Sequence, residues 1–513
     1  MIVNLFRLYC LPLGVVVLVA ILAVKIVLEI VLIVKRGRNQ RKNPNAPKGP
    51  TPLPLLGSLH LLGNRDIPFS GFTDLMPKYG NIFALKMGES ECVVVNSVEL
   101  RDEVLNANQK GDDFDARPNF ERIQRLFGGN KDNALAFCDF SPLQKLRREL
   151  MHKFTFTYSH SELWHEMNKI CMEEGAHMIQ QLRDMASPGN KSIDVKMTVL
   201  KTCGNIFNRY FCGVGHTSYD DPKFHDYIKS FDEVFWEVNT GRLSDFIPWF
   251  ISFECLPLRR AQKASLVVKD YVDNDLVEAT THHDSPMSFL DILRPYLNGS
   301  MPEMDSQTAT YCLEDILGGH SAVGCMVLRI LKDISENEDV QKKIKEELEQ
   351  VKKETGHNIS SLENASLLHW TRAAIFETIR MTCSPIVPHK AIRDSSIGDM
   401  NVEKDTVVFI NNHHLHFSKE LWGSDTEVYD PTRFLKQCEH SGSLIFMRPI
   451  HFKPFSLGKR SCMGYKLVES LTLSLLSNIL ESFSLSPAQE NWKIPVGLLG
   501  LPDEPFRVKI NFE

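Results

Sequence analysis

The N-terminal part of the chain carries a long apolar run. Residues 11–34 form a 24-residue apolar stretch that is interrupted only by Lys25 and Glu29. As a helix, this stretch is long enough to cross a bilayer core of about 30 Å. The i, i+4 spacing of its two charged residues allows them to pair on one face. The run exceeds the apolar core of a cleaved signal peptide, and no A-x-A-like cleavage site follows it. The pattern therefore predicts a transmembrane helix.

Basic residues flank this run unevenly. Arg7 is the single cation before it, whereas five follow it: Lys35, Arg36, Arg38, Arg41 and Lys42. Cationic flanks stay on the cytosolic side of a membrane helix, so the pattern places the rest of the chain in the cytosol. Residues 1–43 are thus predicted to be a membrane anchor with a basic stop.

Residues 44–57 are rich in proline and glycine. The prolines of this segment are Pro44, Pro47, Pro50, Pro52 and Pro54. Proline cannot continue a helix and favours extended, semi-rigid backbone. We therefore expect a hinge that holds the following domain at a fixed attitude to the membrane.

Residues 58–513 have the pattern of one domain. Helical spacing dominates 140–380, whereas 93–95 and 407–410 resemble strands. No second linker, low-complexity run or internal repeat divides this part of the sequence. The expected fold class is mainly α with small β-sheets.

An amphipathic surface helix is predicted over 335–356. Apolar residues recur there at helical spacing among many Lys and Glu residues. The apolar positions are Val340, Ile344, Leu348 and Val351. We interpret the surrounding charges as a solvated face.

Composition narrows the function class. Of the 513 residues, 43% are hydrophobic and 24% are charged, which is typical of a globular protein with a sizeable core. The net charge of −6 argues against nucleic-acid binding, which favours a basic surface. The twelve cysteines include no CxxC pair and no disulfide-framework spacing, so a reducing compartment fits best.

The most specific motif is the segment 455–464, F-S-L-G-K-R-S-C-M-G. Its glycines, Gly458 and Gly464, allow the backbone to approach a flat ligand closely. A helix is predicted directly after it, with Leu467, Leu471, Leu475, Ile479 and Phe483 in register. Cys462 would then lie at a helix N-terminus, where the dipole lowers a thiol pKa.

A soft thiolate in this position is suited to binding haem iron. Arg460 would supply a cation for a haem propionate. The alternative, a buried structural cysteine beside a glycine turn, leaves Phe455 and Arg460 unexplained.

The pattern FxxGxRxCxG resembles the haem-ligand loop of the cytochrome P450 family. Two further signatures agree, in the expected order. Glu377 and Arg380 are similar to the family's ExxR pair, and Arg433 lies in a segment similar to its PxRF motif. In the family these three residues form a structural cluster, and the resemblance implies the same here.

This resemblance implies a cytochrome P450 fold with a single haem domain and haem b as cofactor. It also implies a membrane-anchored monooxygenase of the endoplasmic reticulum, with its catalytic domain in the cytosol. Electrons would come from a separate NADPH–cytochrome P450 reductase, with cytochrome b5 as a candidate second donor. No GxGxxG follows a strand, so no flavin or NADPH domain is fused to the chain.

Two more segments extend the resemblance to residues 44–513. Residues 114–118 look like the start of the loop before the family's C helix, and 245–250 look like its F–G segment. By this resemblance Arg147 and His389 are candidate propionate partners alongside Arg460. One departure weakens Arg147, because Leu143 stands where the family usually has Trp.

A long central helix is predicted over 312–331, and its middle contains Gly318 and Gly319. Two glycines in a helix interior cost about 1 kcal/mol each relative to Ala. We therefore expect that a bound oxygen or substrate needs the space they leave.

The residues after the glycines depart from the family pattern. The family usually carries an acid and an alcohol that relay protons, whereas this chain has Ser321 and Ala322. The proton must then come from Ser321 through water, from His320, or from a substrate hydroxyl. The alternative for His320 is a helix histidine that points away from the haem.

Residues 318–323 and 133–144 together resemble one branch of the family, the Spook and Spookier enzymes of arthropod ecdysteroid synthesis. The resemblance implies a sterol substrate. Three functions stay open: an O₂-dependent sterol monooxygenase, a P450-fold isomerase or dehydratase that needs no reductase, and a non-catalytic haem- or sterol-binding membrane protein.

Two surfaces are predicted from charge and apolarity. A reductase is expected to dock around Lys145, Arg148, Lys453, Lys459 and Lys466. Residues 246–253 are expected to dip into the bilayer, with ordinary core packing as the alternative.

One group of residues looks like a metal site but is weak evidence for one. His413, His414 and His416 lack a fourth ligand and a helical i, i+4 pair, so they are poor zinc ligands.

Overall fold

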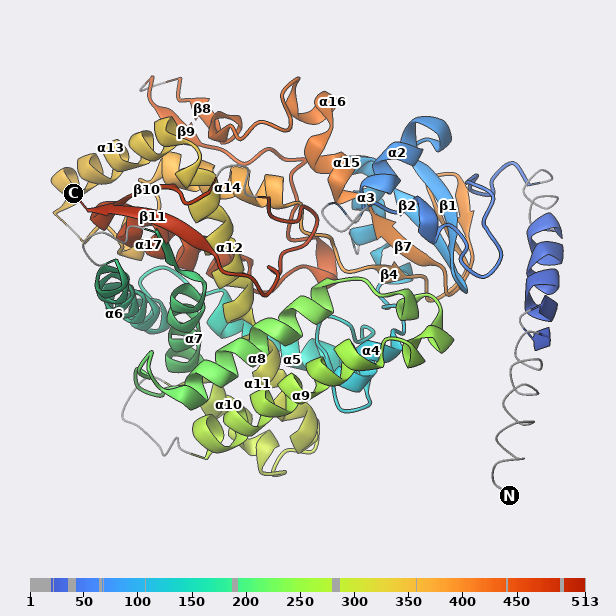
Figure 1. The fold of residues 1–513 in the computed structure, drawn as a ribbon, viewed down its shortest axis with the longest axis horizontal. Coiled ribbons are helices and arrows are strands. Elements are labelled where there is room, and N and C mark those ends of the chain that lie inside the picture. Colours follow the sequence, from blue (N-terminus) through green and yellow to red (C-terminus); the bar gives the residue numbers. More distant parts are fainter. Residues whose placement is uncertain are drawn as a thin grey trace, which may run out of the picture.

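The computed structural model shows a helical body with one larger sheet on one side (Figure 1). The structure describes residues 20–512 except 22, 36–42, 64–66, 68, 107, 187–191, 279–286, 357, 440–441 and 490–492. The predicted fold class, mainly α with small sheets, is confirmed. The first part of the predicted anchor and most of its basic stop lie outside the described residues.

The larger sheet has the strand order β1-β2-β7-β4. Its strands are β1 (Ile82–Met87), β2 (Ser90–Val95), β7 (Val407–Ile410) and β4 (His389–Lys390). β1 and β2 form an antiparallel hairpin, and β7 joins β2 in parallel from more than 300 positions later in the sequence. The strand-like segments 93–95 and 407–410 are thus confirmed, and they pair with each other.

The described residues form three further, smaller sheets. Their strands are β10 (Phe483–Pro487), β11 (Arg507–Phe512) and β3 (Ser192–Asp194); β5 (Ser395–Ile397) and β6 (Met400–Val402); and β8 (Leu435–Gln437) and β9 (Leu444–Phe446). All of their pairings are antiparallel. In β11 the buried residues Val508 and Ile510 alternate with exposed residues. This period of two is expected when one face of a strand packs on the core.

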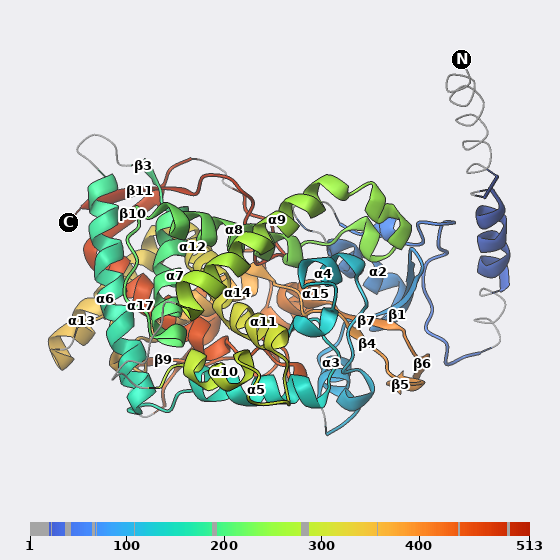
Figure 2. The same ribbon diagram turned by 90° about the horizontal axis from the view of Figure 1, so that it is seen from below.

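The helices make up most of the body (Figure 2). They are α2 (Ser70–Tyr79), α3 (Val98–Leu105), α4 (Glu121–Leu126), α5 (Pro142–Thr155), α6 (Glu162–Met185), α7 (Lys196–Cys212), α8 (Pro222–Asn239), α9 (Cys255–Tyr271), α10 (Phe289–Leu297), α11 (Ser306–Leu317), α12 (Gly319–Ser335), α13 (Glu338–Thr355), α14 (His369–Thr382), α15 (Asn412–Phe417), α16 (Lys419–Trp422) and α17 (Tyr465–Ser482).

The core forms where α12 packs against α7, α14 and α17. Every residue of α12 from Val323 to Leu331 is buried, because partners cover this helix on several sides. A helix that is apolar all round is expected in such a central position. The predicted surface helix is α13, where Ile344, Leu348 and Val351 face the core.

The predicted central helix over 312–331 is in fact two helices. α11 ends at Leu317 and α12 begins at Gly319. At the junction the N–H of Ser321 bonds to the carbonyl of Gly318 at 3.2 Å, a tighter i→i+3 spacing. The glycine pair therefore marks a break in the helix.

The hinge segment runs along β1. The N–H of Ala84 donates to the carbonyl of Lys48, and that of Ser58 donates to the carbonyl of Lys86. At Gly49 a Cβ would lie 1.8 Å from the carbonyl oxygen of Ala84, so only glycine permits this approach.

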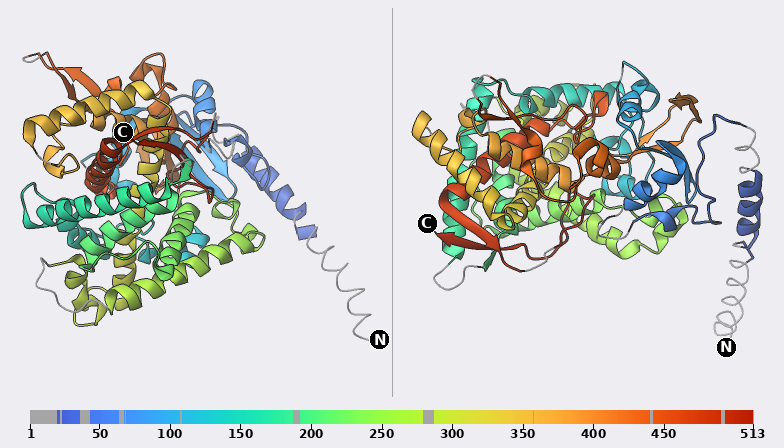
Figure 3. Two further views of the ribbon diagram at one scale, coloured as in Figure 1. Left: turned by 60° about the vertical axis from the view of Figure 1, so that its left-hand side comes forward. Right: turned by 90° about the horizontal axis from the view of Figure 1, so that it is seen from above.

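The N-terminal helix lies beside the β1–β2 hairpin (Figure 3). Helical backbone is described for 20–21 and 23–35. The expected pairing of its two charges with each other is wrong. Lys25 instead pairs with Glu89 and Glu29 with Lys86, each at 2.6 Å. Within the described part of the chain, no helix has the length and apolar content to cross a membrane.

Candidate active site

The loop before α17 has the backbone geometry of a tight cradle. Ser456 and Gly458 both have left-handed backbone, with φ of 63° and 66°. The N–H of Cys462 donates to the carbonyl of Phe455 at 2.9 Å, which closes the loop. An added Cβ at Gly464 would meet no described heavy atom within 4 Å, so the backbone there borders open space.

The thiol of Cys462 differs from its sequence-based expectation. We expected the helix terminus to lower its pKa, but the net effect is an increase. Desolvation by the surrounding protein raises the pKa of Cys462, and the N–H of Gly464 and the Arg148 guanidinium only partly oppose it. α17 begins at Tyr465, three residues after the thiol, so the helix terminus does not offset this desolvation.

Two buried side chains, Arg460 and His389, each keep one nitrogen without a described partner. Arg460 donates through Nη2 to the carbonyls of Ala136 and Cys138, at 3.2 and 2.7 Å. Its Nη1 has no partner among the described residues. His389 is 2% exposed and its Nδ1 bonds to the carbonyl of Phe114 at 2.7 Å, while its Nε2 has no described partner.

Arg147 has partners within the loop before α5. Its Nη1 donates to the carbonyl of Asn133, and its Nη2 donates to that of Asp132 and contacts Cys138 Sγ. Only Nε has no described partner. The side chain therefore anchors the loop before α5 first, and has one nitrogen left for a cofactor.

Sequence reasoning missed Arg117 as a site residue. It is 3% exposed and donates to the carbonyls of Ala136, Val387 and Pro388. It thereby ties the segment before β4 to the loop before α5. Its position within the F-D-A-R-P segment was the available signal.

The glycine junction presents one partly exposed strip. In a region that is otherwise buried, Asp315, Gly318, Gly319 and Ala322 keep some exposure. Their i, i+3, i+4, i+7 spacing puts them on one face, so this face borders internal space. Ala322 belongs to the strip, whereas Ser321 is buried.

Neighbouring rings lie where the two glycines would carry a Cβ. A Cβ on Gly319 would lie 2.8 Å from Phe207 of α7, and one on Gly318 would lie 3.2 Å from Phe231 of α8. The glycines are needed because aromatic rings from neighbouring helices occupy the volume.

His320 points into the protein. It is 0% exposed, lies edge-on to Phe231 at a ring distance of 5.0 Å, and bonds through Nδ1 to the carbonyl of Leu317. Burial lowers the pKa of His320 to about 4. Ser321 Oγ lies 3.4 Å from His320 Nε2 and is directed toward this aromatic group.

Asp315 is an acid that sequence reasoning missed. Its Oδ2 accepts the N–H of Leu135 at 2.7 Å. Burial raises the pKa of Asp315 to about 7. The hydrogen bond from the N–H of Leu135 and the positive charge of Arg147 lower this pKa but do not cancel the effect of burial. Its place one turn before the glycine pair, in an apolar helix, was the available signal.

The ExxR cluster is assembled as expected. Arg380 donates through Nε and Nη2 to the two carboxylate oxygens of Glu377, at 2.8 and 2.7 Å. Arg433 Nε lies 3.5 Å from the same carboxylate. Both members of the first pair are fully buried, so the cluster joins α14 to the segment around 430.

A cavity of about 650 Å³ lies next to this site. Most of its lining is apolar, including Phe72, Phe120, Ile386 and Leu498. Ala136, whose carbonyl accepts from Arg460, also belongs to the wall. The cavity has the size and character of a site for an apolar small molecule.

The cytochrome P450 family model matches residues 47–510. The chain belongs to the cytochrome P450 family. Its cofactor is therefore haem b, and its enzyme class is the haem-thiolate monooxygenase. The residues of the site fit this group, since Gly464 borders open space two residues after the Cys462 thiol, and Arg460 and His389 each keep a buried nitrogen without a described partner.

Two relatives show where the chain falls within the family. Cytochrome P450 307a1 of Drosophila melanogaster (Spook) is 36% identical and is covered over 91% of this chain and 89% of its own length. Steroid 17-alpha-hydroxylase/17,20 lyase of Homo sapiens is 29% identical, over 92% of this chain and 94% of its own. The resemblance to the Spook branch is thus confirmed.

The predicted reductase-docking cations are partly engaged within the protein. Arg148 donates to the carbonyl of Ser461 at 2.9 Å, and Lys459 pairs with Asp112 at 2.7 Å. Lys466 lies over the ring of Phe156, and Lys145 is exposed beside Glu149.

The segment 246–253 has two faces. Phe246 and Ile251 are buried, whereas Trp249 and Phe253 are 43% and 72% exposed. Leu256, at the start of α9, continues the exposed side. The alternative of ordinary core packing therefore holds only for the face that contains Phe246 and Ile251.

Proposed function

We propose that this cytochrome P450 oxidises a sterol in ecdysteroid biosynthesis, using O₂ and electrons from a separate NADPH–cytochrome P450 reductase. The observation that carries the proposal is the apolar cavity beside Arg460 and His389. The names of the two relatives support a steroid, since one is a steroid hydroxylase and the other a member of the Spook branch.

The side chains of the site have distinct roles in this proposal. Cys462 would ligate haem iron, and Arg460 and His389 would hold the propionates. When bound, the haem would supply thiolate-assisted activation of dioxygen. Arg147 contributes by holding the loop that carries Cys138 and Ala136, and so positions the wall of the cavity.

The proton for oxygen activation has few protein sources. Ala322 has none to give, and burial holds Ser321 and His320 among aromatic rings. The strip that contains Ala322 also contains Asp315, whose raised pKa keeps it partly protonated near neutral pH. Ordered water or a substrate hydroxyl on this strip completes the proposed route.

We also propose that the enzyme is a single-pass protein of the endoplasmic reticulum membrane with its body in the cytosol. The apolar run and the basic residues after it support this orientation. Lys25 lies over the ring of Trp249 at 5.8 Å, so the N-terminal helix and the exposed aromatic face are on the same side.

The decisive experiment is turnover on a panel of sterols, with and without NADPH and reductase. We expect product only when both are present. Product without reductase would identify an isomerase or dehydratase, which the missing alcohol at Ala322 keeps open. A sterol-induced change in the haem spectrum without any product would identify a binding protein. Adding cytochrome b5 to the complete reaction then tests whether it acts as a second electron donor and increases product formation.

A further inference from the structure

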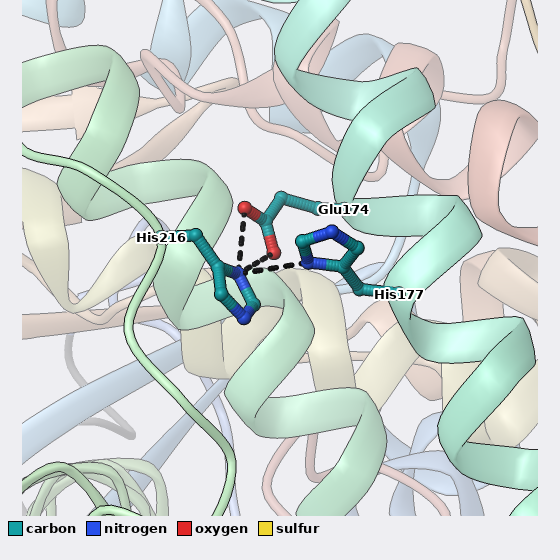
Figure 4. Close-up of side chains that lie close together, drawn as sticks. All are labelled: Glu174, His177 and His216. Carbon is teal, nitrogen blue, oxygen red and sulfur yellow. Dashed lines mark hydrogen bonds and ion pairs between the residues drawn. The ribbon is translucent and has the colours of Figure 1, made fainter.

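Three ligand-type side chains meet far from the haem site, between α6 and the segment after α7 (Figure 4). Glu174 and His177 lie one turn apart on α6, so their side chains share a face. His216 follows α7, where the left-handed Gly213 (φ 72°) turns the chain back toward α6. Asn205 holds this segment in place: its Nδ2 donates to the carbonyl of Thr217, and its Oδ1 accepts the N–H of Thr217.

The three side chains turn their ligand atoms toward one another. His216 Nδ1 lies 3.0 and 2.9 Å from the two carboxylate oxygens of Glu174, and 3.1 Å from His177 Nδ1. All three ligand atoms lie within 4.8 Å of one another. Asn205 Nδ2 also lies 3.3 Å from His216 Nδ1. One Nδ1–H can be shared between the two carboxylate oxygens but does not also satisfy the ring nitrogen of His177 and this amide, so hydrogen bonding alone does not account for the convergence.

The separations from His216 Nδ1 are close to the edge length of a zinc site. With Zn–N bonds of about 2.0–2.1 Å, ligand atoms around a tetrahedral zinc are roughly 3.3 Å apart. Two imidazoles and one carboxylate are also a common protein set for a zinc ion that keeps one open position. Here the open position faces solvent, because His177 is exposed.

The local charge is compatible with a cation. Arg209 pairs with Glu173 and with Oε1 of Glu174, while Oε2 of Glu174 lies against Nδ1 of His216. Two carboxylates against one guanidinium leave one negative charge. Glu174 is fully buried, which fixes its orientation and favours an added positive partner.

We propose that Glu174, His177 and His216 bind one zinc ion, with water as the fourth ligand. The ion would fasten the segment 213–219 to α6 across the outer side of α7. Because the site draws no residue from the haem cradle, its occupancy is independent of the proposed sterol oxidation.

The test uses full-length, haem-loaded protein freed of metal by a chelator, with Zn²⁺ itself as the probe. Calorimetry should show one zinc per chain, together with a higher midpoint of thermal unfolding. His177→Ala and His216→Ala should each weaken binding at least tenfold, since loss of even an outer-shell partner costs about 10–100-fold. His165→Ala, an exposed histidine of the same helix, is the matched control and should bind as the native protein does.

Zinc-edge X-ray absorption identifies the ligands directly. We expect only nitrogen and oxygen neighbours at about 2.0–2.1 Å and no sulfur at about 2.3 Å, which excludes capture by a cysteine. The haem spectrum of each variant reports whether the fold is intact. No zinc binding by the native protein, sulfur ligation, or unchanged affinity in both histidine variants would overturn the proposal.

Discussion

The two sides of the haem site, the cysteine loop and the glycine junction, are built on different principles. In the loop, the geometry comes from local backbone: left-handed Gly458 and the bond from Cys462 N–H to Phe455. At the junction, the geometry comes from rings that two other helices supply, Phe207 and Phe231. The first side is specified by a short sequence and the second by packing, so substitutions should act on them differently.

The largest effect should follow from Cys462→Ala. Removing the thiol deletes the only thiol of the loop, so the thiolate-type band of the reduced CO complex and all turnover should be lost. The absorption spectrum checks this. Cys438→Ala, a cysteine elsewhere, is the control and should keep the band. Retention of the band in the Cys462 variant would mean that another residue binds the iron.

A large effect on stability is expected from Asp315→Asn at the junction. The folded pKa of Asp315 is raised to about 7 from an ordinary value of 3.8, so the folded state binds the proton more tightly than the unfolded state. The contribution of Asp315 to the free energy of unfolding is thus fully present below about pH 4 and is lost as the pH rises through 7. The loss amounts to about 2 to 4 kcal/mol.

Asn keeps an oxygen for the Leu135 N–H but cannot ionise. Denaturant unfolding from pH 5 to 8 should therefore show the native protein losing stability relative to Asp315→Asn. Asp339→Asn, on the surface helix α13, serves as a control for a general charge effect. Parallel curves for Asp315→Asn and the native protein would show that this carboxyl does not titrate across that range.

A smaller effect should distinguish the two glycines. Gly319→Ala forces a Cβ to 2.8 Å from Phe207, and overpacking of this kind costs about 1–3 kcal/mol, offset by about 1 kcal/mol of helix propensity. Gly318→Ala meets Phe231 at 3.2 Å and should cost less. Chemical denaturation gives the order. Adding Phe207→Leu should rescue Gly319→Ala, and a failure to do so would place the strain elsewhere.

The smallest effect should come from Ala322→Thr. If water or a substrate hydroxyl supplies the proton, a new alcohol on the strip should leave the product formed per NADPH unchanged, or lower it by crowding the pocket. Ala322→Val, of the same shape without the hydroxyl, separates crowding from chemistry. A large rise in coupling for the Thr variant alone would show that the missing alcohol is a handicap.

The same contrast explains what the sequence could predict. The strands 93–95 and 407–410, the surface helix α13 and the Glu377–Arg380 pair follow from local patterns, and they are found as expected. The break at Gly318 and the filling of its space were missed, because Phe207 and Phe231 lie about 90 to 110 positions away in the sequence.

The partners of charged side chains could also not be predicted from the local sequence pattern. Lys25 and Glu29 are correctly spaced to pair with each other, yet each finds an opposite charge on the β1–β2 hairpin. The direction of the Cys462 pKa was missed for a related reason, since desolvation depends on all surrounding segments and not only on the helix that follows.

The bonding of the hinge to β1 has a consequence for association between molecules. β1 is the outermost strand of its sheet, and an uncovered outer strand is a template for aggregation. Lys48, Gly57 and Ser58 occupy that template within the same chain. A shortened enzyme that begins at residue 43 keeps the cover and should stay monomeric. One that begins at residue 58 exposes the strand and should self-associate.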